Sequence, residues 1–196
     1  MVALAGLLLS GTAGAVPAAL PRLGPAPNFA LTTQQNDRIW LAHLRGRAVV
    51  LTFACTACGA CPAVLPALRE VGRGLGEAAG RRVFFVAVSV DPARDSPPVL
   101  RRFAREQGLD PVAWVLLTGS PAEIEVVARR FGLAARRQDV PLTRDCLVVL
   151  IDGAGVIRGR YAAAELARLP ADLETLLAES PGSEGGAPGT RAPPRP

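Results

Sequence analysis

Residues 47–62 read Arg-Ala-Val-Val-Leu-Thr-Phe-Ala-Cys-Thr-Ala-Cys-Gly-Ala-Cys-Pro, and this stretch decides the fold. Residues 47–53 form a nearly continuous apolar run, which is typical of a strand covered on both faces of a sheet. Three cysteines follow at intervals of three residues. Pro62 then stands at a position where the first turn of a helix tolerates proline. We therefore predict a buried strand, a cysteine-bearing turn and a helix in direct succession.

Strands and helices are expected to alternate over the rest of the chain. Ser120 and Glu123 have the spacing of a capping box, in which each side chain bonds to the other's backbone N–H. The residues between Ile151 and Val156 are rich in glycine and predict a hairpin. The expected strands are 47–53, 82–90, 114–117, 146–151 and 156–160, and the expected helices are 62–75, 96–107, 120–131 and 164–178. This order predicts an α/β layer fold.

Composition excludes several classes of protein. The chain has 196 residues, which corresponds to one domain with tails, and no apolar run reaches the ~20 residues of a membrane-spanning helix. The net charge is +5, but all 22 basic residues are arginines, scattered among acids. Because few aromatic residues accompany them, we expect no nucleic-acid partner. The single histidine, His43, argues against histidine-rich metal centres and leaves cysteine as the main candidate for chemistry.

The two ends of the chain differ in composition from the middle. Residues 3–9 are apolar and are followed by small residues, as in a signal peptide, so we interpret 1–23 as a signal peptide or N-terminal targeting segment. This predicts a periplasmic or otherwise extracytoplasmic protein, with an uncleaved membrane anchor as the alternative. Residues 180–196 are rich in proline and glycine and are expected to form a disordered tail. The folded domain is expected to span 24–179.

The cysteine run predicts a reactive dithiol. A cysteine at the entrance of a helix faces unpaired backbone N–H groups and the positive end of the helix dipole, which both favour the thiolate. Cys58 is therefore expected to be the attacking sulfur. Cys61, one turn further along, is expected to close a disulfide with it, so that Cys58 and Cys61 form the catalytic pair.

Three other interpretations of the cysteine run are less favoured. A zinc site would need two further cysteines or histidines, of which only Cys55 and the distant Cys146 remain. An iron–sulfur run of the ferredoxin type would need another cysteine at the position of Leu65. The third interpretation is a structural disulfide without turnover, as is common in exported proteins.

The sequence also resembles the Sco/SenC family of thioredoxin-like, copper-handling proteins that assemble cytochrome c oxidase. The resemblance covers nearly the whole core and is most specific in LTGSPAEIE, which begins at Leu117. The other matching stretches are 27–32 and 40–46, VVLTFACTAC from Val49, DPARDSPPVLRRFA from Asp91 and LVVLID from Leu147. The resemblance implies a thioredoxin-like fold with a central mixed sheet flanked by helices. It also implies copper as Cu(I) and a partner that is the copper-site subunit of a terminal oxidase or another exported thiol protein.

This chain departs from the family pattern at two places. In the family, the pattern of copper-carrying members is C-x3-C-P, with two thiolates and one histidine as ligands. This chain has C-x2-C-P from Cys58 to Pro62, so that one residue fewer separates the two cysteines. The position of the family's histidine falls on Arg144, and an arginine cannot bind Cu(I). His43 lies in the first hairpin of the resemblance, where a surface or core-edge position is expected.

Cys146 offers a replacement for the missing histidine. If its strand runs antiparallel beside strand 47–53, as in the thioredoxin architecture, Cys146 begins close to the cysteine run. Cys58, Cys61 and Cys146 would then form an all-thiolate Cu(I) site, with Cys55 as a further candidate. The alternatives are a Cys55–Cys146 disulfide and two cysteines that only fill space in the core. The carboxylates Asp91 and Asp95 are interpreted as parts of a turn and a helix cap.

Two functions follow from the sequence. The first is copper delivery, or maintenance of reduced thiols, during assembly of cytochrome c oxidase. The alternative is a metal-free thiol–disulfide oxidoreductase. In that mechanism the Cys58 thiolate attacks a partner disulfide and Cys61 resolves the mixed disulfide.

Overall fold

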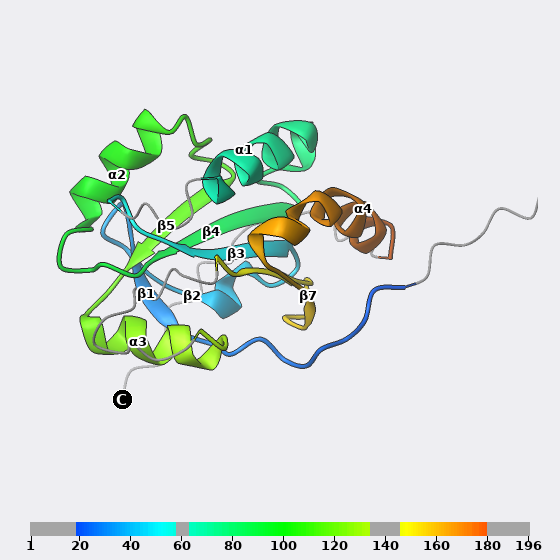
Figure 1. The fold of residues 1–196 in the computed structure, drawn as a ribbon, viewed down its shortest axis with the longest axis horizontal. Helices are drawn as coiled ribbons and strands as arrows, with labels where there is room; N and C mark the ends of the chain where they lie inside the picture. Colours follow the sequence, from blue (N-terminus) through cyan, green and yellow to red (C-terminus); the bar gives the residue numbers. More distant parts are fainter. Residues whose placement is uncertain (1–18, 58–62, 134–145, 180–196) are drawn as a thin grey trace, which may run out of the picture.

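A computed structural model describes residues 19–57, 63–133 and 146–179 (Figure 1). Within these ranges the strands form one seven-stranded mixed sheet in the order β2-β1-β5-β4-β3-β6-β7. The strands are β1 (Ala30–Thr33), β2 (Arg38–Trp40), β3 (Ala48–Ala54), β4 (Val83–Ser89), β5 (Trp114–Thr118), β6 (Val148–Ile151) and β7 (Ile157–Tyr161). The α-helices are α1 (Val64–Gly74), α2 (Pro97–Glu106), α3 (Pro121–Arg130) and α4 (Leu169–Glu179).

The three central strands are parallel, and their neighbours are antiparallel. β3 pairs with β4 along its whole length, from Ala48 opposite Val83 to Ala54 opposite Ser89. β4 pairs in parallel with β5, whereas β1 joins β5 and β6 joins β3 in antiparallel pairs. The predicted strand 47–53, its mixed sheet and its antiparallel neighbour are therefore confirmed.

Both faces of the sheet are covered, as the apolar runs require. In β3, Val49, Leu51 and Phe53 pack into one core, while Ala48 and Val50 pack into another on the opposite face. Helices α1, α2 and α4 cover the second face and α3 covers the first (Figure 1). Alternate residues of each central strand thus meet different helices, which explains why these strands read as continuous apolar runs.

The last helix differs from its prediction. The expected helix 164–178 is divided into a 3-10 helix, Ala163–Arg168, and α4. Pro170 explains the division, because it lacks the N–H that a continuous α-helix would donate to the carbonyl of Leu166. Ser96 also differs from its prediction, because it occupies the N-cap of α2 without making a side-chain capping hydrogen bond.

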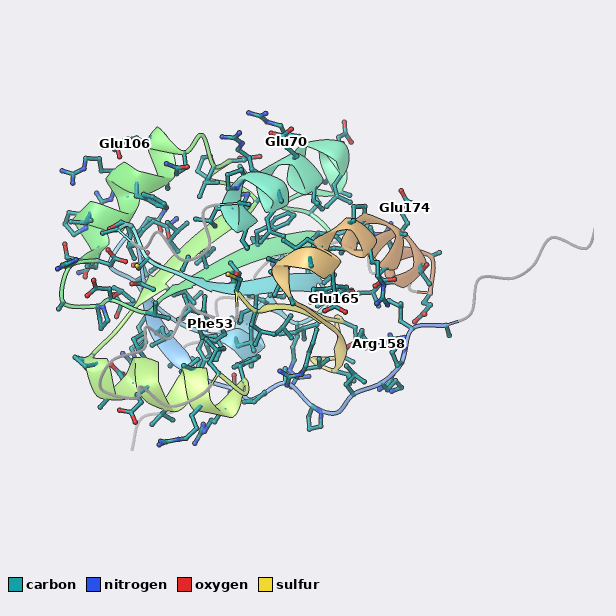
Figure 2. The ribbon with its side chains drawn as sticks, in the orientation of Figure 1. Phe53, Glu70, Glu106, Arg158, Glu165 and Glu174 are labelled. Atoms are coloured by element: carbon teal, nitrogen blue, oxygen red, sulfur yellow. The ribbon has the colours of Figure 1, made fainter. Side chains whose placement is uncertain are left out.

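A segment that precedes the sheet is held against β7. The Leu23 N–H donates to the Ile157 carbonyl, and the Ile157 N–H donates to the Gly24 carbonyl. The buried Arg158 guanidinium donates to the carbonyls of Leu20 and Pro21. Figure 2 shows Arg158 beside this segment. The proposed boundary at residue 23 therefore lies within a stretch that contacts the domain.

Across the described ranges, no helix combines the length and the apolar character that crossing a membrane requires.

The capping box at the start of α3 is confirmed. The Ser120 N–H donates to Glu123 Oε2 at 2.8 Å, and the Glu123 N–H donates to Ser120 Oγ at 3.3 Å. Arg38 of β2 adds an ion pair of 2.5 Å to Glu123 Oε1. The hydrogen bond from Arg38, followed by those from Ser120, lowers the pKa of Glu123 from 4.5 to about 2.

We expect Glu123→Gln to remove part of the acid sensitivity of the fold. Because the folded-state pKa is depressed, this carboxylate stabilises the protein fully above pH 4.5, and its contribution disappears as the pH falls toward 2. The side chain is 35% exposed, so solvent screening limits the contribution to below about 1 kcal/mol. Urea unfolding of both proteins should give a free-energy difference that is constant between pH 5 and 7 and vanishes near pH 2. A difference independent of pH would contradict this prediction.

Candidate thiol site at the carboxyl edge of the sheet

The candidate site lies where the parallel strands end. β3 and β4 reach this edge together, since Ala54 pairs with Ser89. β6 runs the opposite way and begins here, with Val148 opposite Thr52. The Thr52 hydroxyl also donates to the Leu147 carbonyl at 3.1 Å. The loops after β3 and β4 and the residues before β6 therefore meet at one edge, which is where open α/β sheets usually bind ligands.

Two of the four cysteines lie in the described ranges, and both are at this edge. Cys55 follows β3 directly, and Cys146 precedes β6 by two residues. Both are half-buried and both are disulfide-bonded. The expectation that they only fill space in the core is therefore wrong. Cys58 and Cys61 fall outside the described residues, so their pairing and ligand roles remain predictions.

The backbone at Cys146 is in an unfavourable conformation. Its φ of +40° lies in the left-handed region, which a side-chain-bearing residue other than asparagine or aspartate rarely adopts. Such a conformation costs of order 1–3 kcal/mol and persists only where the surroundings impose it. Cys146 is disulfide-bonded and lies two residues before Val148, where the β6 pairing begins.

A fully buried carboxylate ties the cysteine-bearing segment to the β4–α2 loop. Asp95 is 0% exposed. Its Oδ1 accepts the Thr56 hydroxyl at 2.5 Å, and its Oδ2 accepts the Thr56 N–H at 3.1 Å. Oδ2 also accepts the Ser89 hydroxyl at 2.6 Å. Three hydrogen bonds therefore compensate for the buried charge, as burial of a carboxylate requires.

The interpretation of Asp95 as part of a helix cap is wrong. Its side chain turns toward the loop after β3 instead of capping α2, whose N-cap is Ser96. Only Asp91 behaves as a turn residue, because its carbonyl accepts the Asp95 N–H at 2.9 Å. Sequence reasoning missed this contact because Thr56 and Asp95 are far apart along the chain. One signal in the sequence could have indicated the contact. Asp95 is an acidic residue that follows a buried parallel strand, and the loops after such strands lie at the same edge of the sheet as the predicted cysteine site.

A small, mostly apolar pocket adjoins the same contacts. It lies between the sheet and helices α1 and α2 and is lined in part by Cys55, Thr56 and Asp95 together with Leu65 and Phe103. Cys55 and Thr56 therefore border a mostly apolar pocket that the hydrogen-bonded Asp95 also lines.

His43 is not part of the site. It is exposed in the 3-10 helix Leu41–Leu44, which precedes β3, whereas the cysteines follow β3. A strand of seven residues separates the two positions by about 20 Å. In the described ranges no group of three or more histidine, cysteine, aspartate and glutamate residues is arranged to hold a metal ion.

Comparison with known proteins places this geometry in a family. The SCO1/SenC family model matches residues 21–177. Bradyrhizobium japonicum ScoI, solved with copper bound, is 29% identical, with a TM-score of 0.65 over 78% of this chain and 99% of that one. BsSco, described as a Sco-family cytochrome c oxidase assembly protein with a disulfide switch, is 23% identical, with a TM-score of 0.68 over 81% and 97% of the two chains.

A plant relative matches a shorter stretch. The mitochondrial SCO1 homolog 1 of Arabidopsis thaliana is 33% identical over 104 residues, which are 53% of this chain. This match spans 30% of the Arabidopsis protein, so the similarity concerns one part of it.

Proposed function

Since this chain belongs to the SCO1/SenC family, we propose that it binds Cu(I) through thiolates and delivers it, or keeps the thiols of a copper site reduced, during assembly of cytochrome c oxidase. The observation that carries the proposal is the antiparallel pairing of β3 with β6, which brings Cys146 to the edge where the cysteine run begins. The partner we propose is the copper-site subunit of a terminal oxidase.

The chemistry of the available ligands suits Cu(I). Soft thiolates favour Cu(I), and Cys58, Cys61 and Cys146 can supply three of them without an imidazole. The family's histidine position falls on Arg144, outside the described residues, and an arginine cannot take its place as a ligand. A third thiolate from Cys146 is therefore the replacement that this chain offers.

We infer that the site would need a second, reduced form to bind copper. Cys55 and Cys146 are disulfide-bonded, and a sulfur in a disulfide is not a thiolate ligand. Copper loading thus requires prior reduction, in which an external dithiol donates two electrons and leaves as a disulfide. Disulfides are more common in proteins of oxidising compartments, and we propose a periplasmic or otherwise extracytoplasmic location, with association to a membrane through the N-terminus as a further proposal.

The second candidate is the metal-free thiol–disulfide oxidoreductase. The shortened cysteine spacing and the engagement of Cys55 and Cys146 in disulfides favour it. Cys58 thiolate would attack a partner disulfide, and Cys61 would release the partner as a dithiol while the Cys58–Cys61 disulfide forms. Another exported thiol protein would then be the partner.

Titration of the fully reduced protein with Cu(I) against a competing chelator tests the copper proposal. We expect one tightly bound equivalent of Cu(I) in the wild type, because the proposal assigns three thiolate ligands to one ion. Cys58→Ser should weaken binding by at least about 100-fold, since removal of a ligand leaves a two-thiolate site. Cys146→Ser should weaken it measurably as well.

The outcomes separate the two candidates. A wild-type protein that fails to compete for Cu(I) contradicts copper binding. If the same protein reduces insulin disulfides and the Cys58→Ser variant does not, the thiol–disulfide oxidoreductase becomes the supported function. If the Cys146→Ser variant binds copper as tightly as the wild type, Cys146 is not a copper ligand. The proposed ligands are then Cys58 and Cys61 alone.

A further inference from the structure

We propose that the amino edge of the sheet docks on an anionic membrane surface, where a hollow lined by Arg45 and Arg47 takes the phosphate of a phospholipid headgroup. The amino edge is the edge at which the parallel strands β3 and β4 begin, opposite the thiol site. The inference uses no cysteine. It rests on the proposed function only in so far as it deepens the proposed association with a membrane.

Three segments of the chain meet around this hollow. The Gly46 N–H, just before β3, donates to the Gly153 carbonyl in the β6–β7 turn at 2.9 Å. The Ala26 N–H, before β1, donates to the Gly155 carbonyl in the same turn at 2.8 Å. Residues of all three segments line the hollow. Because these hydrogen bonds fix the segments against one another, the hollow is formed before any ligand binds.

The exposed charge at the hollow is positive. Arg45 is exposed and Arg47 is half-buried, and within the described part of the chain neither forms an ion pair with a carboxylate. Arg45 donates to a backbone carbonyl, and Arg47 lies 4.9 Å over the ring of Phe84, contacts that leave both charges unneutralised. The lining also contains Asp152, but that carboxylate is 8% exposed and paired with Arg158 at 3.3 Å. Two guanidinium groups are therefore available, and their geometry matches the oxygens of a phosphate.

The surroundings of the hollow favour a membrane over a dissolved anion. Leu23, on the segment that borders the hollow, is 52% exposed, and the neighbouring Arg22 side chain is 66% exposed. An exposed leucine among arginines suits the boundary between headgroups and acyl chains. Residues 3–9 of the same segment's upstream sequence are apolar. A bilayer offers partners for the leucine, for the arginines and for this apolar stretch together.

Docking at the amino edge places the thiol site away from the membrane. The Leu20 N–H donates to Glu179 at the end of α4, and Arg82, just before β4, donates to the Leu177 carbonyl of the same helix. The described chain thus begins at the amino edge, beside the end of α4 (Figure 1). The seven residues of β3 separate the two edges by about 20 Å. A docked domain therefore presents Cys55, which follows β3, to a partner that extends from the bilayer.

Co-sedimentation of the full chain with lipid vesicles tests the inference. One set of vesicles contains phosphatidylcholine alone, and the other contains phosphatidylcholine and phosphatidylglycerol in equal parts. We expect the wild type to bind the anionic vesicles more tightly and to lose this preference as salt is added, because salt screens exposed charges. The double variant Arg45→Gln/Arg47→Gln should bind the anionic vesicles about 25-fold more weakly, which is about five-fold for each basic residue at the surface.

Arg94→Gln/Arg168→Gln is the matched control, because it changes the net charge by the same amount. Both side chains are about as exposed as that of Arg22, at 73% and 69%, but they follow β4 and β7, which end at the opposite edge. This variant should bind within about two-fold of the wild type, since its charges lie beyond the Debye length of about 8 Å from the docked surface. Arg45→Lys/Arg47→Lys keeps both cations and should bind within about three-fold. Far-UV circular dichroism checks that each variant is folded.

The outcomes distinguish docking at this edge from other causes of binding. Equal weakening by the two glutamine variants, or equal binding of the wild type to both sets of vesicles, overturns the inference but leaves the proposed membrane association standing. A folded lysine variant that binds as weakly as Arg45→Gln/Arg47→Gln overturns it as well. Release of the wild type by dissolved glycerol phosphate at constant ionic strength would show that the hollow takes a free phosphate instead of a lipid. A wild type that binds neither set of vesicles contradicts both the docking and the membrane association, and the copper titration then stands as a separate test.

Discussion

Arg158→Met is expected to lower the free energy of unfolding by about 3–5 kcal/mol, because it leaves buried charge without a partner. The Arg158 side chain is 6% exposed, and its guanidinium lies 3.3 Å from Asp152, whose side chain is 8% exposed, and 2.6 Å from Glu179. It also donates to the carbonyls of Leu20 and Pro21. One side chain thus joins the hairpin turn, the last helix and the segment before the sheet. Urea unfolding measures the free energy of unfolding of both proteins. The comparison holds if the variant keeps the wild-type m-value, the slope of the unfolding free energy against urea concentration.

Arg22→Met is the matched control for this effect. Arg22 approaches the same Asp152 oxygen at 3.9 Å, but its side chain is 66% exposed. Its loss should cost less than about 1 kcal/mol, since exposed ion pairs contribute little. The double variant Arg158→Met with Asp152→Asn should recover part of the loss, because the unpaired buried charge is then removed. Equal destabilisation by the two single variants would show that burial of Arg158 is not the cause.

The sequence predicted the elements whose patterns are local. The strand 47–53 became β3, and the capping box at Ser120 and Glu123 was found where it was expected. Apolar runs and capping residues act over a few positions, so their consequences can be read directly. The division of the last helix also has a local cause, Pro170, which the periodicity of the apolar residues concealed.

The site was less accessible to sequence reasoning because it depends on contacts between distant segments. The adjacency of Cys146 to the end of β3 followed only from the family resemblance and is confirmed by the β3–β6 register. Nothing local distinguishes Asp95 from Asp91 as the carboxylate that is buried and bonded to Thr56. Buried polar networks of this kind are chosen by three-dimensional complementarity, which the spacing of residues along a chain does not encode.

The core packing of β3, the strand that precedes Cys55, is also expected to be sensitive to substitution. Phe53→Ala should lower the free energy of unfolding by about 3–5 kcal/mol, the usual cost of emptying a fully buried aromatic site. Phe53 is 2% exposed and lies on the face of β3 that α3 covers (Figure 2). Its ring centroid is 5.9 Å from that of Phe131, just after α3. Chemical denaturation followed by far-UV circular dichroism measures the change.

Two further variants identify the cause of that loss. Phe53→Leu keeps most of the apolar volume and should cost about 1–2 kcal/mol, because only part of the cavity remains. Phe84→Ala on the neighbouring strand should cost clearly less than Phe53→Ala, because the Phe84 ring is half-buried and stacks under the Arg47 guanidinium at 4.9 Å. If Phe84→Ala were the more damaging of the two, the packing of Phe53 against Phe131 would not be the main contribution to the stability of β3.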